Sequence, residues 1–145
     1  MADRLPTTPF VALGVLRIVS GLIFLAHGTQ KFLSFPAGQM AGKGWAFDNP
    51  GAYAGLIELF AGALIVLGLL TRPAAFIASG TMAVAYWYAH APNNFFPINN
   101  GGDAAILYCF VFLYLIFAGP GAWSLDGILK RQRREQRAAE ASARE

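Results

Sequence analysis

Apolar residues form four continuous runs, separated by short stretches rich in polar residues, glycine and proline. The runs cover residues 10–33, 51–70, 73–90 and 103–119. An α-helix rises about 1.5 Å per residue, so roughly 20 residues cross a hydrocarbon core about 30 Å thick. Continuous apolar runs favour helices over the alternating strands of a β-barrel. The pattern therefore predicts an all-α transmembrane four-helix bundle in residues 1–129 and a separate tail in residues 130–145.

The composition supports a membrane protein over a soluble one. Hydrophobic residues make up 56% of the chain and charged residues 13%, and the mean hydropathy is +0.47. Both fractions depart from those of soluble globular domains. The first run is not typical of a cleaved signal sequence, because Arg17 interrupts it and no small-residue cleavage pattern follows. We therefore expect it to be retained as a membrane span.

The distribution of charge predicts how the bundle is oriented. The tail carries six basic residues against three acidic ones, and a basic cluster directly after a span marks the cytoplasmic side. With four spans, the N-terminus and C-terminus are then both cytoplasmic, and the loops 34–50 and 91–102 face outward. Attraction to anionic lipid explains the basic tail more simply than nucleic acid does, and we expect no nucleic-acid partner.

Two local features complete the outline of the chain. Ser124 is placed to cap a final helix, so the tail is expected to be amphipathic or disordered. Cys109 is the single cysteine, so no intrachain disulfide can form, and we interpret it as a small packing residue in the fourth span.

Polar residues share one face of the first span. At 100° per residue, Arg17, Ser20, His27 and Lys31 fall within an arc of about 80°. Glycines spaced seven residues apart adjoin this stripe: Gly14, Gly21 and Gly28. Small residues allow membrane helices to approach closely, so this face is expected to point into the bundle. Close packing alone is a sufficient explanation for the glycines.

Glu58 is the main candidate for a functional residue in the second span. A lone charge in hydrocarbon costs about 2.5–3.5 kcal/mol on insertion scales, so such residues are usually paired. Glu58 and His27 lie at similar depths, about 10 Å and 9 Å from the outer ends of their spans. We therefore expect Glu58 to pair with His27 or Lys31. Arg17 lies deeper, and it either joins this group from below or binds carbonyls and headgroups at the inner leaflet.

Further polar residues are predicted at the same outer level. His90 ends the third span and Asp103 opens the fourth. The sequence thus predicts a putative ligand pocket of His27, Lys31, Glu58, His90 and Asp103, supported by Arg17, Gln30 and Asn100. The neighbouring Tyr86, Trp87 and Tyr88 are explained by an interfacial aromatic belt. No set of metal ligands is predicted.

The chain resembles the DoxX family of small bacterial and archaeal four-span membrane proteins. The resemblance covers residues 10–129 and is carried by three segments: LRIVSGLIFLAHGTQKF, GLIELFAGALIVLGLLTRPAA and NNGGDAAILYCFVFLYLIFAGPGAWSLDG. The family commonly has Glu at the start of the fourth span, where this chain has Asp103. The resemblance implies a plasma- or inner-membrane location, but it supplies no catalytic residue list.

The family takes its name from a subunit of a thiosulfate:quinone oxidoreductase, and other members look like partners of oxidative-stress or sulfur-handling enzymes. The resemblance therefore implies a membrane subunit or accessory protein of a quinone-linked redox system, with quinone and soluble redox enzymes as partners. Whether this chain is itself an enzyme stays open. The alternatives are a proton-coupled or small-molecule transporter, which would need a homo-oligomer, and a scaffold that recruits enzymes through its basic tail. Haem b between His27 and His90 is a less favoured cofactor than quinone.

Overall fold

The computed structural model describes residues 7–144, and every regular element in that range is a helix. The all-α bundle predicted from the sequence is confirmed. In chain order the elements are α1 (Thr7–Leu33), η1 (Lys43–Trp45), α2 (Pro50–Leu67), α3 (Thr71–Ala85), η2 (Tyr86–His90), α4 (Pro97–Asn100), α5 (Asp103–Ala118) and α6 (Leu125–Ser142).

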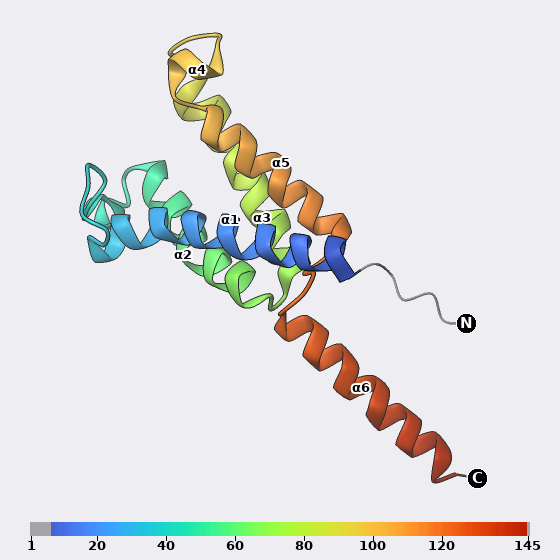
Figure 1. Cartoon of the computed structure of the whole chain (residues 1–145). Helices are drawn as coiled ribbons and strands as arrows, with labels where there is room; N and C mark the ends of the chain where they lie inside the picture. Colours follow the sequence, from blue (N-terminus) through green and yellow to red (C-terminus); the bar gives the residue numbers. More distant parts are fainter. Residues whose placement is uncertain (1–6, 145) are drawn as a thin grey trace.

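The first hairpin consists of α1 and α2, which pack side by side (Figure 1). Their contact depends on glycine. A Cβ atom at Gly28 would lie 2.5 Å from the backbone nitrogen of Leu59, and one at Gly62 would lie 2.9 Å from Cα of Leu25. The expectation that the glycine face of the first span points into the bundle is confirmed, because Cβ atoms at Gly14, Gly21 and Gly28 would all lie within 3.0 Å of other segments.

The second hairpin consists of α3, η2, α4 and α5. Alanines on α3 are buried against α5, and the Ser79 hydroxyl donates a hydrogen bond of 2.8 Å to the Cys109 carbonyl. The Cys109 Sγ atom lies 3.6 Å from the same hydroxyl. Cys109 therefore occupies a packed helix contact, as predicted for a small structural residue.

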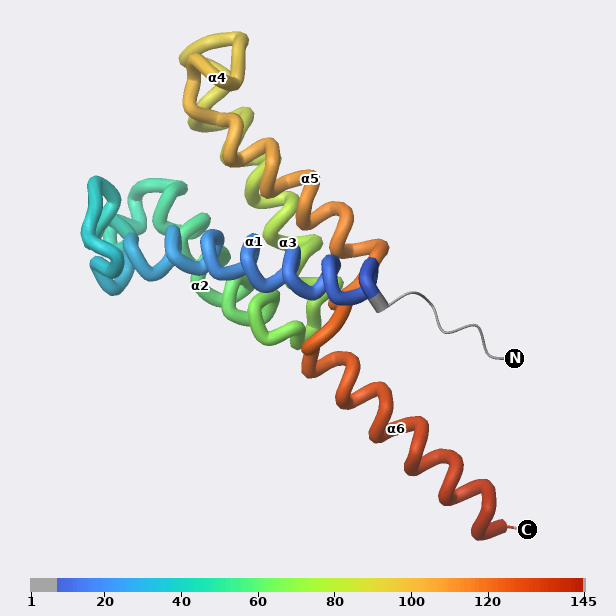
Figure 2. Tube along the Cα trace, in the orientation of Figure 1, coloured from blue at the N-terminus to red at the C-terminus, as the bar shows by residue number. Residues whose placement is uncertain are grey.

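The two hairpins meet at one end and separate at the other. Figures 1 and 2 show the loop that joins α1 to α2 and the tip at α4 lying well apart. Where the hairpins cross, the ring of Phe24 on α1 packs edge-on against Phe112 on α5, with centroids 4.8 Å apart. Both rings are fully buried, and the fold therefore has a shared apolar centre.

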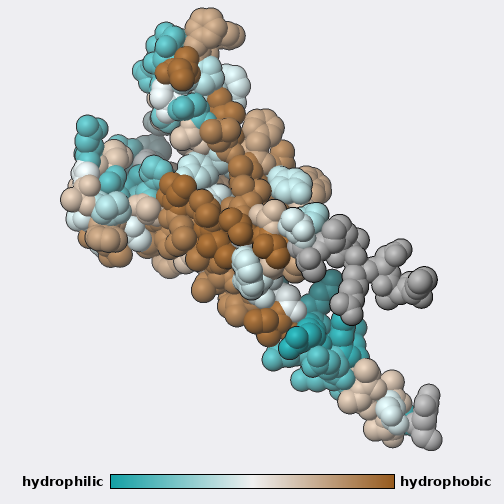
Figure 3. Space-filling view, in the orientation of Figure 1, coloured by the Kyte–Doolittle hydropathy of each residue, from teal (hydrophilic) through white to brown (hydrophobic). Residues whose placement is uncertain are grey.

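Helix lengths and exposed side chains fit a membrane protein. By length and composition, two helices can cross a membrane, within residues 8–33 and 50–67. The apolar α5 has 16 residues, about 24 Å of helix, and α3 with η2 forms a further 20 residues, about 30 Å. Hydrophobic residues cover much of the middle of the bundle on the face seen in Figure 3. Large apolar side chains are exposed on α2, α3 and α5, among them Phe60, Phe76 and Phe117. Such a surface would be unfavourable in water.

The last helix, α6, leaves the bundle and extends away from it (Figure 1). The Ser124 hydroxyl accepts a hydrogen bond of 3.2 Å from the Gly127 N–H, which confirms the predicted cap. Of the two states expected for the tail, the structure has the helix, which continues to Ser142. Its surface is mainly hydrophilic near the bundle (Figure 3).

Candidate functional site

A buried ion pair links the two helices of the first hairpin. The Lys31 Nζ atom donates hydrogen bonds of 2.8 Å and 2.7 Å to the two carboxylate oxygens of Glu58. The side chains are only 11% and 7% exposed. Of the two partners predicted for Glu58, the structure thus selects Lys31. Neither charge is left alone in the apolar interior, which is what the insertion cost requires.

Small residues on α2 make room for this pair. A Cβ atom at Gly55 would lie 2.8 Å from Cδ of Lys31, so the aliphatic part of the lysine lies directly over the glycine. One turn away, the glycine contact at Gly28 brings the backbones of α1 and α2 together beside Glu58. The lysine stem can therefore run along α2 and deliver its ammonium group to the carboxylate.

His27 lies one helical turn before Lys31 on α1, and its side chain is exposed. Its ring meets the ring of Tyr108 on α5 edge-on, with centroids 6.2 Å apart and planes at 90°. Tyr108 in turn stacks on Phe112 at 5.6 Å and lies 5.6 Å from Phe24. An imidazole and a phenol thus stand at the edge of an aromatic cluster formed by both hairpins.

Tyr108 is the residue of this site that sequence reasoning missed. It lies in the middle of an apolar helix, where a tyrosine is easily interpreted as packing. The available signal was the placement of a phenol five residues inside α5, away from the membrane interfaces where tyrosine is most frequent.

Three other predicted site residues, His90, Asn100 and Asp103, lie at the tip of the second hairpin. The His90 Nδ1 atom is 3.0 Å from the Asn100 carbonyl oxygen, and Asp103 is exposed as the first residue of α5. Within residues 7–144 no hydrogen bond or ion pair joins either residue to Glu58. Gln30 donates to the Pro36 carbonyl at 3.2 Å. The structure therefore pairs Lys31 with Glu58 and places His27 one helical turn before Lys31, against Tyr108, while His90 is held with Asn100 in a separate polar group.

Arg17 has a different role from the outer polar residues. It is completely buried, and its guanidinium group donates hydrogen bonds only to backbone carbonyls in the described part of the chain. The acceptors are Ile65 and Val66 at the end of α2 and Pro120, Ala122 and Trp123 after α5. Of the alternatives for Arg17, binding to carbonyls is the one observed. The guanidinium fork suits several acceptors held in fixed directions.

Asp126 completes this inner group of contacts. Its two carboxylate oxygens accept hydrogen bonds of 2.9 Å from the N–H groups of Leu70 and Thr71, at the start of α3. Burial raises the pKa of the Asp126 carboxyl, but these N–H donors and the charge of Arg17 outweigh it, and the pKa is lowered overall. Asp126 thus stays ionised and caps α3 from α6, a role that was not predicted from the sequence.

The outer group around the Lys31–Glu58 ion pair and the inner group around Arg17 have different chemical capacities. The donors of Arg17 are all used to hold backbone segments together, which is a structural task. By contrast, His27 is exposed and Tyr108 is only partly buried, so the imidazole and the phenol hydroxyl can both reach a ligand beside the ion pair. No cluster of three or more metal-binding side chains occurs in residues 7–144. The chemistry available at the outer group is hydrogen bonding and proton exchange.

Comparisons with known proteins agree with this architecture. The sequence model of the DoxX family matches residues 12–91. The chain is 49% identical over 117 residues to an uncharacterized protein of Haemophilus influenzae, covering 79% of this chain and 87% of that protein. It is 35% identical over 129 residues to the inner membrane protein YphA of Escherichia coli, covering 80% and 89%.

A third relative is the uncharacterized membrane protein Rv3486 of Mycobacterium tuberculosis, which is 31% identical over 134 residues, covering 81% of this chain and 80% of the relative. No solved structure matches the chain significantly. The apolar helical bundle and the relatives both indicate a membrane protein. By the family match over more than half of its length, the chain belongs to the DoxX family.

Proposed function

We propose that this protein is an integral membrane subunit or accessory protein of a quinone-linked redox system, and that it holds the quinone head group beside the Lys31–Glu58 ion pair. The observation that carries the proposal is an exposed imidazole in contact with a partly buried phenol, with the imidazole one helical turn along α1 from the buried Lys31–Glu58 ion pair. The likeness to a family named after a thiosulfate:quinone oxidoreductase subunit supports the same direction.

A quinone head group has requirements that this site can meet. Its two carbonyl oxygens need hydrogen-bond donors, and its ring needs flat apolar neighbours. The His27 ring N–H and the Tyr108 hydroxyl are donors of the right kind. The Tyr108 ring is only partly buried and stacks on Phe112 at 5.6 Å, so it offers an aromatic surface against which a further ring can pack, while Phe24 and Phe112 support it from the buried side.

The ion pair supplies the electrostatic part of the site. Reduction of a quinone to a quinol takes two electrons and two protons. In this proposal the partner oxidoreductase supplies the electrons, and His27 exchanges protons with the head group. Lys31 and Glu58 are buried together, so their charges are little screened by water and act strongly on any polar group beside them.

Quinone binding to the purified full chain tests the proposal. A short-chain ubiquinone or menaquinone analogue is titrated into the protein in mild detergent, and binding is followed by intrinsic fluorescence quenching. We expect H27A and Y108F each to weaken binding about fivefold to tenfold, because each removes one hydrogen-bond donor. Tyr108→Phe keeps the aromatic ring, so the bundle is expected to remain folded.

His90→Ala is the matched control, because it removes the chain's second histidine at the tip of the other hairpin. Its affinity is expected to equal that of the unmodified protein. Equal affinities for the quinone in H27A, Y108F and the unmodified protein would exclude this site, and loss of binding in H90A would move the site to the other tip.

A further inference from the structure

We infer that α6 and the turn between α2 and α3 form a binding site for one anionic phospholipid, with the phosphate held by the basic face of α6. The inference rests on a surface pocket that lies outside the outer polar group. It does not depend on the proposed quinone role.

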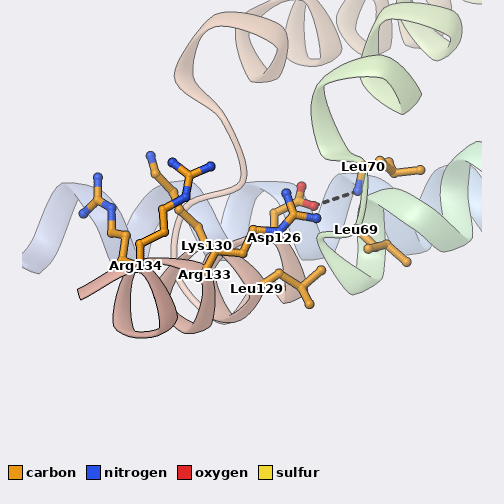
Figure 4. Close-up of a pocket in the computed structure, with 8 residues that line it drawn as sticks. Leu69, Leu70, Asp126, Leu129, Lys130, Arg133 and Arg134 are labelled. Atoms are coloured by element: carbon orange, nitrogen blue, oxygen red, sulfur yellow. Dashed lines mark hydrogen bonds between the residues drawn. The ribbon is translucent and has the colours of Figure 1, made fainter. Parts of the chain in front are cut away.

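Four cations define one side of this pocket, which has a volume of about 470 Å³. At 100° per residue, the α6 residues Lys130, Arg133, Arg134 and Arg137 lie within an arc of about 100°. Figure 4 shows that the first three extend toward the same side of α6 as Asp126. None of the four forms an ion pair within residues 7–144. Their charges are therefore available to an anion.

The docking of α6 fixes the direction of this basic face. Asp126 is held by the N–H groups at the start of α3, and its own N–H donates to the Gly68 carbonyl at 2.8 Å. These bonds anchor the first turn of α6 against the end of the bundle. Among the described residues Asp126 is the one carboxylate that lines the pocket, and its two oxygens already accept the donors of α3, which reduces its repulsion of a phosphate.

Leucine side chains form the other side of the pocket. Leu69 and Leu70 come from the α2–α3 turn, and Leu129 lies on α6 between the anchor and the cations. Leu70 is 57% exposed and Leu129 43% exposed. Apolar groups directly beside unpaired cations match an amphiphile, since acyl chains can cover the leucines while the phosphate meets the arginines. A free phosphate ion would leave the leucines in water.

The position in the fold also favours a lipid. The turn between α2 and α3 is where two apolar helices end, so it lies at the predicted boundary between hydrocarbon and water. Juxtamembrane clusters of basic residues attract anionic headgroups. With the termini predicted on the cytoplasmic side, this end of the bundle meets the inner leaflet.

Native mass spectrometry of the full chain in mild detergent tests the inference. The probes are phosphatidylglycerol and phosphatidylcholine with identical acyl chains. We expect tenfold or greater preference for phosphatidylglycerol in the unmodified protein. Each removed charge is expected to weaken binding about fivefold, so R133Q shows a partial loss and K130Q/R133Q/R134Q/R137Q loses the preference.

Arg131→Gln is the charge-matched control. Arg131 does not line the pocket, and its Nε atom lies 3.5 Å from a carboxylate oxygen of Glu135. R131Q is expected to keep the preference for phosphatidylglycerol. Glutamine favours helix nearly as well as arginine and lysine do, and circular dichroism checks that α6 stays helical in every variant.

Two further arms separate the lipid from other anions. Millimolar inorganic phosphate is expected not to displace phosphatidylglycerol, and Leu129→Asn is expected to weaken the lipid complex although it removes no charge. Equal retention of both lipids, equal loss in R131Q, displacement by inorganic phosphate, or unchanged binding in L129N would each overturn the inference.

Discussion

Replacing Arg17 by methionine is expected to destabilise the bundle more than any other single change at the inner end. Methionine fills a similar length but donates no hydrogen bond, so all five carbonyl acceptors lose the guanidinium. Within residues 7–144, no second donor reaches the carbonyls of Pro120, Ala122 or Trp123. Of these three hydrogen bonds, the one to Ala122 is buried and the other two are part-buried. A buried acceptor left alone costs about 1–3 kcal/mol, so R17M is expected to lower the free energy of unfolding by at least about 1 kcal/mol.

The assay is the free energy of unfolding in mixed detergent micelles, followed by circular dichroism. The unfolding free energy of Arg17→Lys is expected to lie between those of R17M and the unmodified protein, because an ammonium group donates at most three hydrogen bonds. Arg72→Gln removes an exposed arginine at the same end of the bundle, and its effect is expected to stay within about 0.5 kcal/mol. If R17M proves as stable as R72Q, the carbonyl contacts of Arg17 do not hold the bundle together.

Three further predictions concern separate contacts. Glu58→Gln is expected to destabilise the bundle by about 3–5 kcal/mol, because it leaves the Lys31 ammonium buried and unpaired. The double variant K31M/E58L is expected to recover most of this loss, because it removes both charges. Equal free energies of unfolding for E58Q and the double variant in the same assay would contradict this prediction. The pKa of Asp126 is lowered in the folded protein, so the stabilisation from its carboxylate is complete above the pKa of the unfolded chain, near 4, and is lost as the pH falls further. The difference in unfolding free energy between the unmodified protein and D126N is therefore expected to shrink between pH 5 and pH 3. A difference that stays constant would refute the role of Asp126 as an ionised cap of α3. Gly28→Ala is expected to destabilise the first hairpin, because its Cβ would lie 2.5 Å from the α2 backbone, while Gly80→Ala, with nothing within 4 Å, is the tolerated control.

The sequence was sufficient for the membrane helices because their length and apolar character are local properties. The predicted span 10–33 appears as a helix that ends at Leu33, and the predicted start of the fourth span at Asp103 is the first residue of α5. Counting residues from the outer ends also brought Glu58 to the level of Lys31, because helical rise converts position into depth.

The separation of the two hairpins was not predictable in the same way. The angle between helices depends on how side chains from distant segments interdigitate, as Phe24 and Phe112 do here. A set of polar residues at one depth therefore appears as one pocket in the sequence, although the structure divides it between two hairpins. His90 illustrates this, since its polar contact is with Asn100 of its own hairpin.

The partners of Arg17 were equally hidden from the sequence. All five acceptors are backbone carbonyls, and any residue type carries a carbonyl. The sequence pattern therefore gives no acidic side chain that would identify the partner of Arg17. The segment GPGAWSLDG contains three of the acceptors of Arg17 and the carboxylate that caps α3. These contacts form only when the segment folds back against the ends of α1 and α2, which the sequence alone does not indicate.

The carbonyl contacts of Arg17 also bear on how the chain matures during synthesis. Arg17 lies on α1, whereas its acceptors lie 48 to 106 residues further along the chain. Until the segment after α5 has been translated, the buried cation has only the Ile65 and Val66 carbonyls of α2 as acceptors. A polypeptide truncated before Pro120 would therefore lack three of the five carbonyls that hold the guanidinium.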